Sequence, residues 1–203
     1  MGRLLEAAYD YEVRLRGYVY VGDEATKMHI ASAAKALTAP DGKNGLLIMG
    51  LYGNGKSTLL RAVCRTIGLL NEGLYGDAKK RIKMVSAKKL ARLGGARDTE
   101  DEFRKYIDES LLAIDDLGEE AAEIVEYGSV RTPLKDLLQE RYERGLFTIV
   151  TTNLIEARNS DDPAMHQITA RYGARVVDRF REEMNIIVFR NESYRGRLRA
   201  GHK

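Results

Sequence analysis

Short apolar runs alternate along this chain with segments in which apolar residues recur every three or four positions. The runs are GLLIMG (45–50), RIKMVSA (81–87), SLLAIDDLG (110–118), FTIVTTNL (147–154) and NIIVF (185–189). Each is typical of a buried strand, and the periodic segments between them predict helices. Strands that alternate with helices favour an α/β fold, in which a five-stranded parallel sheet is covered by helices on both faces.

The predicted helices have recognisable start signals and apolar faces. Asp23 is a typical N-cap residue for a helix that would turn Met28, Ala31, Ala34 and Leu37 inward. The helix after residue 56 would bury Leu59, Leu60, Val63, Ile67 and Leu70. Thr132-Pro133 predicts the start of another helix, with an inward face of Leu134, Leu137, Leu138 and Tyr142. Two short helices are predicted at AKKLARL (87–93) and EDEFRKYID (100–108).

Length and composition set the class of protein. The 203 residues suffice for one well-buried domain and are few for two. Hydrophobic residues (44%) and charged residues (31%) occur as in ordinary soluble globular proteins. No apolar run is long enough to cross a bilayer, so no membrane partner is expected. The single cysteine, Cys64, excludes an internal disulfide, suits a reducing cytoplasm and is expected to be a small core residue.

GLYGNGKST, residues 50–58, lies between a predicted strand and a predicted helix and matches the phosphate-loop pattern in full. Its glycines let the backbone approach phosphates closely, while successive N–H groups point at them from the positive end of the helix. We expect Lys56 to reach the β- and γ-phosphate oxygens and the Ser57 hydroxyl to bind magnesium. The residues expected to bind ATP or ADP are Gly50, Gly53, Asn54, Gly55, Lys56, Ser57 and Thr58.

Two later strands end in polar residues. LLAIDD delivers two acids to the carboxyl end of its strand, where ligands bind in such sheets. We expect Asp115 to hold magnesium, mostly through water, and Asp116 to polarise the attacking water; the alternative is a pair of acids that cap a loop. Glu119 and Glu120 are weaker candidates for the role of Asp116. TIVTTN ends in Asn153, which we expect to face the γ-phosphate.

The segment RYGARVVDRF carries three arginines at helical spacing. Arg171, Arg175 and Arg179 are four residues apart, which predicts that they share one helical face. Like charges at this spacing destabilise a helix by about 0.2–0.5 kcal/mol per pair, and an anion outside the helix would offset that cost. The alternative is a solvated basic face that Glu182 and Glu183 neutralise.

The net charge of +3 is too small to identify a partner, but basic residues are unevenly distributed. Positions 79–97 contain no acid and carry Lys79, Lys80, Arg81, Lys83, Lys88, Lys89, Arg92 and Arg97. The segment after residue 191 is also basic, whereas TEDEFRKYIDE between the two is acidic overall. Such a basic run is either a solvated face or a nucleic-acid contact, and both interpretations stay open at this point.

GLYGNGKST, LLAIDDLG, LLQERYERGLFTIVTTNL, YGARVVDRF and NESYR follow one another in this order. Together they resemble the DnaC/IstB-like branch of the AAA+ ATPases, which comprises bacterial and phage helicase loaders and related transposition ATPases. The resemblance covers roughly residues 22–195 and implies an AAA+ P-loop domain with strand order 5-1-4-3-2. It implies that Asp115 and Asp116 form the Walker B pair and that Asn153 is sensor 1. Arg179 matches the arginine finger, which acts on ATP bound by a neighbouring subunit, and Arg175 matches its companion.

The resemblance also implies a DNA contact and a domain organisation. Lys88, Lys89 and Arg92 lie where initiator-type relatives place the DNA contacts that line a pore. Contacts of that kind would bind single-stranded DNA without regard to its sequence. The chain is divided into a short N-terminal extension (1–22), an AAA+ ATPase domain (23–195) and a basic C-terminal tail (196–203).

Three features depart from the pattern of this family. Asp116 stands where many AAA+ proteins have glutamate, so we expect slow hydrolysis. The separate N-terminal domain with which loaders grip a helicase is either missing, supplied by another chain or removed. No C-terminal lid domain is expected after the fifth strand, so no lid arginine can be assigned, although Arg195 is a candidate for part of its role.

These inferences predict an ATP-hydrolysing helicase loader that acts in DNA replication, binds single-stranded DNA and self-associates through its ATP sites. Two alternatives share the same motifs. One is an IstB-like transposition ATPase whose partner is a transposase instead of a replicative helicase; the other is a nucleotide-gated adaptor that scarcely hydrolyses ATP. A small-molecule P-loop kinase is disfavoured, because the arginines follow a strand that ends in asparagine and the sequence indicates no mobile arginine-bearing lid.

Overall fold

The computed structural model describes residues 1–40, 42–75, 81–126, 129–154 and 167–196. Its centre is a parallel sheet made of β1 (Gly45–Gly50), β2 (Lys83–Ser86), β3 (Leu111–Leu117), β6 (Phe147–Thr152) and β7 (Met184–Phe189). The strands lie in the order β2-β3-β6-β1-β7. Counted along the chain, these are strands 2-3-4-1-5, which is the predicted order 5-1-4-3-2 read from the other edge. The predicted five-stranded parallel sheet is therefore confirmed.

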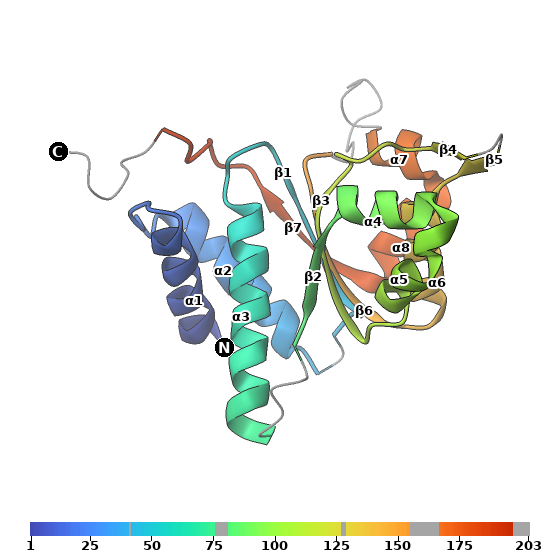
Figure 1. Ribbon diagram of the computed structural model, residues 1–203. Coiled ribbons are helices and arrows are strands. Elements are labelled where there is room, and N and C mark those ends of the chain that lie inside the picture. The colour runs from blue at the N-terminus through green and yellow to red at the C-terminus, as the bar shows by residue number, and fades with distance from the viewer. Residues whose placement is uncertain (41, 76–80, 127–128, 155–166, 197–203) are drawn as a thin grey trace.

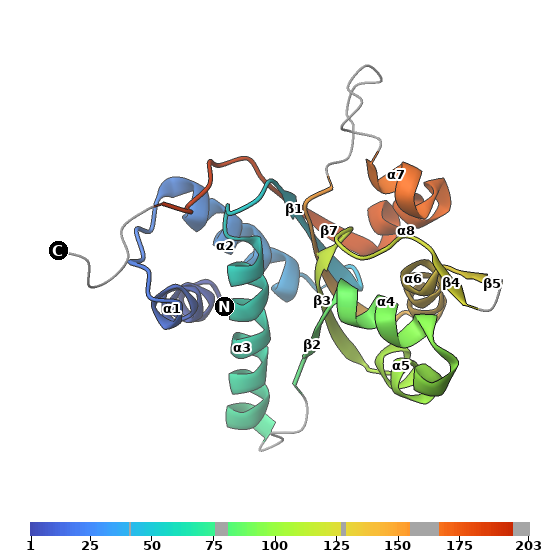
Figure 2. The ribbon, with the colours of Figure 1, turned by 45° about the horizontal axis from the view of Figure 1, so that its top comes forward.

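Helices cover both faces of this sheet (Figures 1 and 2). One face carries α1 (Gly2–Leu15), α2 (Glu24–Thr38) and α3 (Lys56–Tyr75). The other face carries α4 (Ala87–Gly95), the 3₁₀ turn Arg97–Thr99, α5 (Glu100–Ile107), α6 (Pro133–Glu143), α7 (Gln167–Tyr172) and α8 (Ala174–Glu183). A separate apolar cluster lies on each side, as expected for a sheet buried on both faces. Among the described residues, none of these helices combines the length and the apolar character of a membrane span.

The start of α2 is confirmed, and its predicted inward face is right for Ala34 and Leu37 and wrong for Met28 and Ala31. The Asp23 carboxylate accepts a hydrogen bond from the Thr26 N–H at 2.9 Å, as an N-cap residue should. Met28, however, is 61% exposed. Besides Ala34, the helix buries four residues that were not predicted: Thr26, His29, Ile30 and Ala33. The reason is a contact with the sheet: the His29 ring stacks on the Phe189 ring of β7 at 3.7 Å, which rotates the helix away from the face that apolar residues alone indicate.

The three arginines of RYGARVVDRF do not share one helical face. Gly173 adopts a φ of +84°, and α7 ends before it while α8 begins after it. Arg171 lies on α7, whereas Arg175 and Arg179 lie on α8. The prediction is wrong for Arg171, because a left-handed glycine interrupts the helical spacing on which it depended.

A short antiparallel hairpin, β4 (Ile124–Glu126) with β5 (Ser129–Arg131), was not predicted. Its strands are too short to give a clear alternation of apolar and polar residues. Ile124 packs against the core next to α4. A Cβ on Gly95 would lie 2.6 Å from Ile124 Cδ1, so the glycine at the end of α4 allows the hairpin to approach.

A buried arginine fastens α6 to the sheet. Arg141 is 1% exposed, and its guanidinium donates to the carbonyls of Ile107 (2.9 Å) and Phe147 (2.8 Å) and to the Thr148 hydroxyl (3.0 Å). Burial lowers the pKa of Arg141 to about 10, which leaves it charged at neutral pH. The side chain therefore joins the end of α5 and the start of β6 through backbone acceptors, a role that its charge did not suggest.

The first helix of the chain packs against the domain. Leu5, Ala8 and Tyr9 of α1 are buried in the apolar cluster that includes α3. Glu12 is also buried, and its carboxylate lies 2.7 Å from the Arg65 guanidinium of α3. Residues 1–22, expected to be an extension, thus supply a helix and a following segment that reach the phosphate loop. The expected tail beyond residue 196 lies outside the described residues.

Candidate nucleotide-binding site

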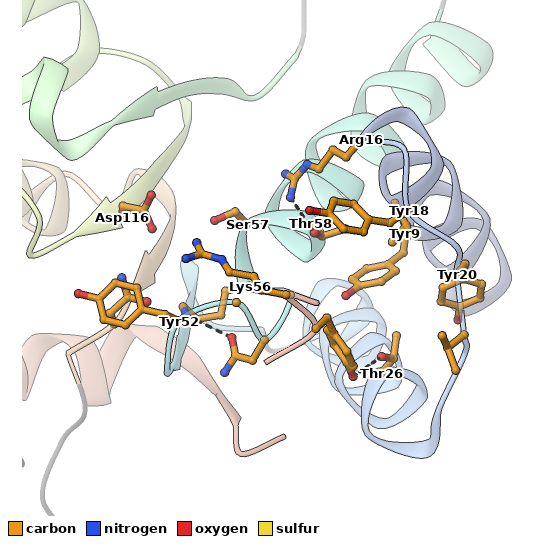
Figure 3. Close-up of a pocket in the computed structure, with 18 of the residues that line it drawn as sticks. Tyr9, Arg16, Tyr18, Tyr20, Thr26, Tyr52, Lys56, Ser57, Thr58 and Asp116 are labelled. Carbon is orange, nitrogen blue, oxygen red and sulfur yellow. Dashed lines mark hydrogen bonds between the residues drawn. The ribbon is translucent and has the colours of Figure 1, made fainter. Parts of the chain in front are cut away.

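A cavity of about 590 Å³ lies where β1, β3 and β6 end, between the phosphate loop and the segment that joins α1 to α2. Figure 3 shows Asp116 on one side of Ser57, and Arg16, Tyr9 and Tyr18 on the other. A volume of this size falls within the range of small-molecule and cofactor pockets. The cavity brings together residues that the sequence analysis placed in one site and others that it did not consider.

The loop between β1 and α3 has the backbone that the motif requires. Gly53 (φ +76°) and Gly55 (φ +104°) both adopt left-handed conformations. A Cβ on Gly55 would lie 2.4 Å from the Tyr9 hydroxyl oxygen, and one on Gly53 would lie 2.2 Å from Ser193 Oγ. Both glycines are thus required by the close approach of other parts of this chain, in addition to any phosphate.

The Lys56 side chain is buried and curls over its own loop. Its ammonium donates to the Leu51 carbonyl at 2.7 Å and to Asn54 Oδ1 at 3.2 Å. Burial lowers the pKa of Lys56 to about 8, while the nearby Asp116 and Asp115 oppose that shift. A phosphate oxygen is a stronger, charged acceptor than these neutral groups. The ammonium is therefore positioned for an anion in the loop.

The two acids of β3 are oriented by a single hydroxyl. Thr151 Oγ1 donates to Asp115 Oδ1 at 2.6 Å and accepts from the Asp116 N–H at 2.9 Å. The pairing of β3 with β6 is irregular between Ile114 and Leu117, and Asp116 has a φ of +58°. This bulge turns Asp116 into the cavity, whereas the buried Asp115 lies behind it, 3.6 Å from the Arg61 guanidinium. Burial and the neighbouring Asp115 raise the pKa of Asp116.

Glu119 and Glu120, the two weaker candidates, have different surroundings. Glu119 lines the cavity and accepts hydrogen bonds from the Tyr52 hydroxyl (2.7 Å) and from Asn153 Nδ2 (3.3 Å). These bonds, the one from Tyr52 first, lower the pKa of Glu119. Glu120 is buried instead against Tyr172 and Arg171. Only Glu119 is thus placed to act beside Asp116, and Asn153 lies in the cavity as expected.

The two arginines of α8 lie away from this cavity. The Arg179 guanidinium stacks over the Tyr142 ring at 4.2 Å and lies 3.3 Å from the Glu143 carboxylate. Arg175 is exposed. Neither lines the cavity as far as the described residues define it. If either acts on a nucleotide, that nucleotide is bound by another subunit.

The residues proposed for DNA binding are divided between two surroundings. Lys88 lines the cavity, 3.9 Å from the Glu119 carboxylate. Lys89 lies 3.4 Å from the Glu102 carboxylate, and Arg92 is exposed. Lys79 and Lys80 of the same basic stretch lie outside the described residues. Lys88 therefore adjoins the nucleotide site, whereas Lys89 and Arg92 form the outer surface of α4.

The wall opposite the acids is aromatic and was not predicted. It is formed by Tyr9, Tyr18 and Tyr20, with Tyr194 from the segment after β7. The Tyr194 hydroxyl bonds to both carboxylate oxygens of Asp23, at 2.9 and 3.0 Å. An aromatic wall beside a phosphate loop can pack against a planar base. In the sequence, YVYVG before the Asp23 cap and NESYR after the last strand carry three of these four tyrosines.

The sheet order, the phosphate loop after the first strand and the polar ends of the third and fourth strands define a P-loop protein of the AAA+ fold. No protein-family model and no curated protein matches the chain. Its fold is similar to that of the DnaC helicase loader, with a TM-score of 0.63 at 21% identity over 93% of this chain and 99% of that one. DnaI gives a TM-score of 0.56 at 21% identity over 84% and 87%.

The replication initiator DnaA, in a structure with AMPPCP and single-stranded DNA, also shares the fold. Its TM-score is 0.54 at 17% identity over 85% of this chain. The match covers 49% of the DnaA chain, so this protein spans about half the length of that one. At these identities the comparisons establish a common fold, and activity and partners have to be argued from the site.

Proposed function

We propose that this protein binds and slowly hydrolyses Mg·ATP and acts in DNA replication as a helicase loader that contacts single-stranded DNA. The observation that supports this most directly is the convergence of Lys56, Ser57, Asp116 and Asn153 on one cavity. Asp116 and Asn153 come from the ends of β3 and β6, and Lys56 and Ser57 follow the loop after β1. The carboxyl ends of the strands are the place where α/β sheets bind ligands.

The residues around the cavity can divide the work of phosphoryl transfer among them. The loop amides and Lys56 would hold the phosphates, and Asp116 or Glu119 would orient the attacking water. Asn153, hydrogen-bonded to Glu119, would face the γ-phosphate. Oxygen donors suit magnesium: the Ser57 hydroxyl lines the cavity, and the Asp115 carboxylate, buried behind Asp116, would hold the ion through water. Bound there, the ion would neutralise phosphate charge.

Self-association through the ATP sites is part of this proposal. Arg175 and Arg179 lie outside the cavity of their own subunit. An arginine that completes a site on a neighbouring subunit would have to lie outside the cavity of its own subunit, as both of these do. The energy of ATP binding would then be used to arrange subunits around a DNA strand.

The choice of partner rests on the fold neighbours. DnaC is described as a helicase loader, and DnaA is bound to single-stranded DNA in its structure. A transposition ATPase with a transposase partner remains the second candidate, since it shares the same motifs. A weakly hydrolysing adaptor is the third, favoured by the aspartate at position 116.

Nucleotide binding is tested with Lys56→Ala and a fluorescent ATP analogue in the presence of magnesium. We expect the variant to lose tight binding while it keeps its fold, because the ammonium faces the loop and not the apolar core. Lys35→Ala, an exposed lysine of α2, is the matched control and should bind as the wild type does. Equal affinity of Lys56→Ala and the wild type would overturn the site.

The partner is tested by affinity capture from host lysate with ATP present. Recovery of the replicative helicase supports the loader, and recovery of a transposase favours the second candidate. Turnover measured with and without single-stranded DNA separates an ATPase from the adaptor, which would bind ATP and release no phosphate in either condition.

A further inference from the structure

Arg16 joins the first helix to the phosphate loop. It is the C-cap residue of α1, and Gly17 (φ +76°) turns the chain immediately after it. Its side chain enters the cavity, where Nη1 donates to Thr58 Oγ1 at 3.0 Å (Figure 3). Thr58 lies two residues after Lys56, in the first turn of α3. A cation from a distant part of the chain thus reaches the positive end of the phosphate-binding helix.

The acidic residues near Arg16 are paired with other arginines. Its hydrogen-bond partner is a neutral hydroxyl, and Arg16 forms no ion pair with the residues that the structure describes. Glu12, on the same helix, is paired with Arg65 at 2.7 Å. Asp115, the other nearby acid, is 3.6 Å from Arg61.

Arg61 adds a second guanidinium to the same region. Its Nε is buried and has no hydrogen-bond partner among the described residues. Burial first, and then the charge of Arg61, lower the pKa of Arg16, although an arginine stays protonated at neutral pH. Arg16 and Arg61 are two partly buried cations beside a helix N-terminus, and Asp115 is paired with only one of them. They form a local excess of positive charge that suits an anion.

The geometry points to Arg16 as a ligand of the α- and β-phosphates of the nucleotide that its own subunit binds. Asp116 and Asn153 mark the end of the cavity where the terminal phosphate and the attacking water belong. Arg16 and Thr58 lie at the opposite end, beside the Tyr9 and Tyr18 wall (Figure 3). A nucleotide that spans the cavity would therefore place its inner phosphates at the guanidinium. This inference rests on the proposed binding of ATP.

Arg16 would make α1 part of the nucleotide site. Its planar guanidinium can bond two phosphate oxygens at once, which the hydroxyl of Thr58 cannot match. Because the contact is with inner phosphates, ATP and ADP would hold α1 equally. This distinguishes Arg16 from the proposed role of Arg179, which depends on the γ-phosphate.

The test compares the affinities of wild type, Arg16→Ala, Arg16→Gln and Arg16→Lys for fluorescent analogues of ATP and ADP. We expect Arg16→Ala and Arg16→Gln to bind both nucleotides about 10- to 100-fold more weakly, as for the loss of a hydrogen bond to a charged group. Arg16→Lys should retain part of the affinity. Arg14→Ala is the matched control, since Arg14 lies on the same helix, exposed and paired with Asp10, and should change neither affinity.

A merely structural role would give a different result. If Arg16 only fastens α1 to α3, Arg16→Ala should lower the melting temperature of the nucleotide-free protein, and the affinities should not change. We expect that melting temperature to stay within about 3 °C of the wild type while the stabilisation by saturating ADP shrinks. Arg16→Gln, which keeps a donor for Thr58, covers the case in which the alanine variant does not fold.

The outcomes separate this inference from the proposed function. A wild type that binds neither nucleotide contradicts the proposed function itself. A wild type that binds both, with unchanged affinities in Arg16→Ala and Arg16→Gln, overturns only the role of Arg16. Weakened binding of ATP with unaltered binding of ADP also overturns it, because the contact would then be with the γ-phosphate.

Discussion

Arg179→Ala separates a role in catalysis on a neighbouring subunit from a role in holding this subunit together. In the structure the guanidinium contacts Tyr142 and Glu143 of α6, donates to the Gln139 carbonyl at 3.4 Å, and contacts nothing in the described part of the nucleotide cavity. Glu143 is 60% exposed, so its ion pair contributes at most about 1 kcal/mol. Stacking over Tyr142 adds about 0.5–1 kcal/mol.

These contacts set the size of the structural effect. Their loss together should lower the stability by about 1–2 kcal/mol, which corresponds to a melting temperature lower by about 2–8 °C in a chain of this length. An arginine that stabilises transition-state charge contributes a factor of about 10³–10⁵ in rate in other phosphoryl-transfer systems. We therefore expect Arg179→Ala to bind ATP almost normally, to lose hydrolysis almost entirely and to remain folded.

Mixing two inactive variants tests whether the arginine acts between subunits. Lys56→Ala lacks bound ATP but keeps Arg179, while Arg179→Ala has the opposite defect. Random assembly of equal amounts pairs an intact loop with an intact arginine at about a quarter of the interfaces of a closed ring, so about a quarter of the wild-type turnover should return. Phosphate release is measured at protein concentrations where co-assembly is demonstrated by cross-linking.

A mixture that stays inactive although the subunits co-assemble refutes the role of Arg179. Arg175→Ala is then mixed with Lys56→Ala in the same way. Failure of both arginines would remove the shared site from the proposed mechanism, and a site complete within one chain would have to be sought.

Three further predictions follow from the site and the fold. Asp116→Asn should retain ATP binding and lose turnover; retained turnover would assign the water to Glu119. Replacing Lys88, Lys89 and Arg92 of α4 together by alanine should weaken the binding of single-stranded DNA. The slope of log affinity against log salt concentration should become shallower by about 0.7 for each phosphate contact that is lost. An unaltered slope would mean that these residues form a solvated surface. In urea unfolding, Arg141→Met should cost about 1–3 kcal/mol for each buried carbonyl that is left without a partner. The control Arg144→Met, 41% exposed, should cost under about 1 kcal/mol.

The local sequence pattern was sufficient to predict the sheet and the phosphate loop. Apolar runs marked all five strands, because a parallel sheet covered on both faces buries most residues of its central strands. The loop motif is contiguous in sequence, so Lys56 and Ser57 could be placed without knowledge of the fold. Asp116 and Asn153 could be placed because strand ends at one edge of a parallel sheet converge.

The remainder depends on contacts between distant segments. Arg16 meets Thr58 across 42 positions, and nothing in either local sequence indicates the other. Arg141 follows Leu134, Leu137 and Leu138 on the inward face of α6, but a charged side chain is not expected to be buried. Only the fold shows the backbone carbonyls that accept its hydrogen bonds. The spacing of the three arginines predicted a continuous helix across Gly173, but the backbone is left-handed there. The periodicity of a sequence does not show where a single residue leaves the helical conformation.

The hydroxyl of Thr151 restricts which residues its strand can accept. Valine has nearly the same shape as threonine, and both are favoured in strands. Here the side chain is fully buried and passes a hydrogen bond from the Asp116 N–H through its own oxygen to the Asp115 carboxylate. Valine would keep the packing but leave both the Asp115 carboxylate and the Asp116 N–H without this partner. By strand propensity alone, threonine and valine are interchangeable at this position. The hydroxyl is needed only where Asp115 and Asp116 have to be held in place, so a valine here in a related protein would indicate that the two acids no longer have their role.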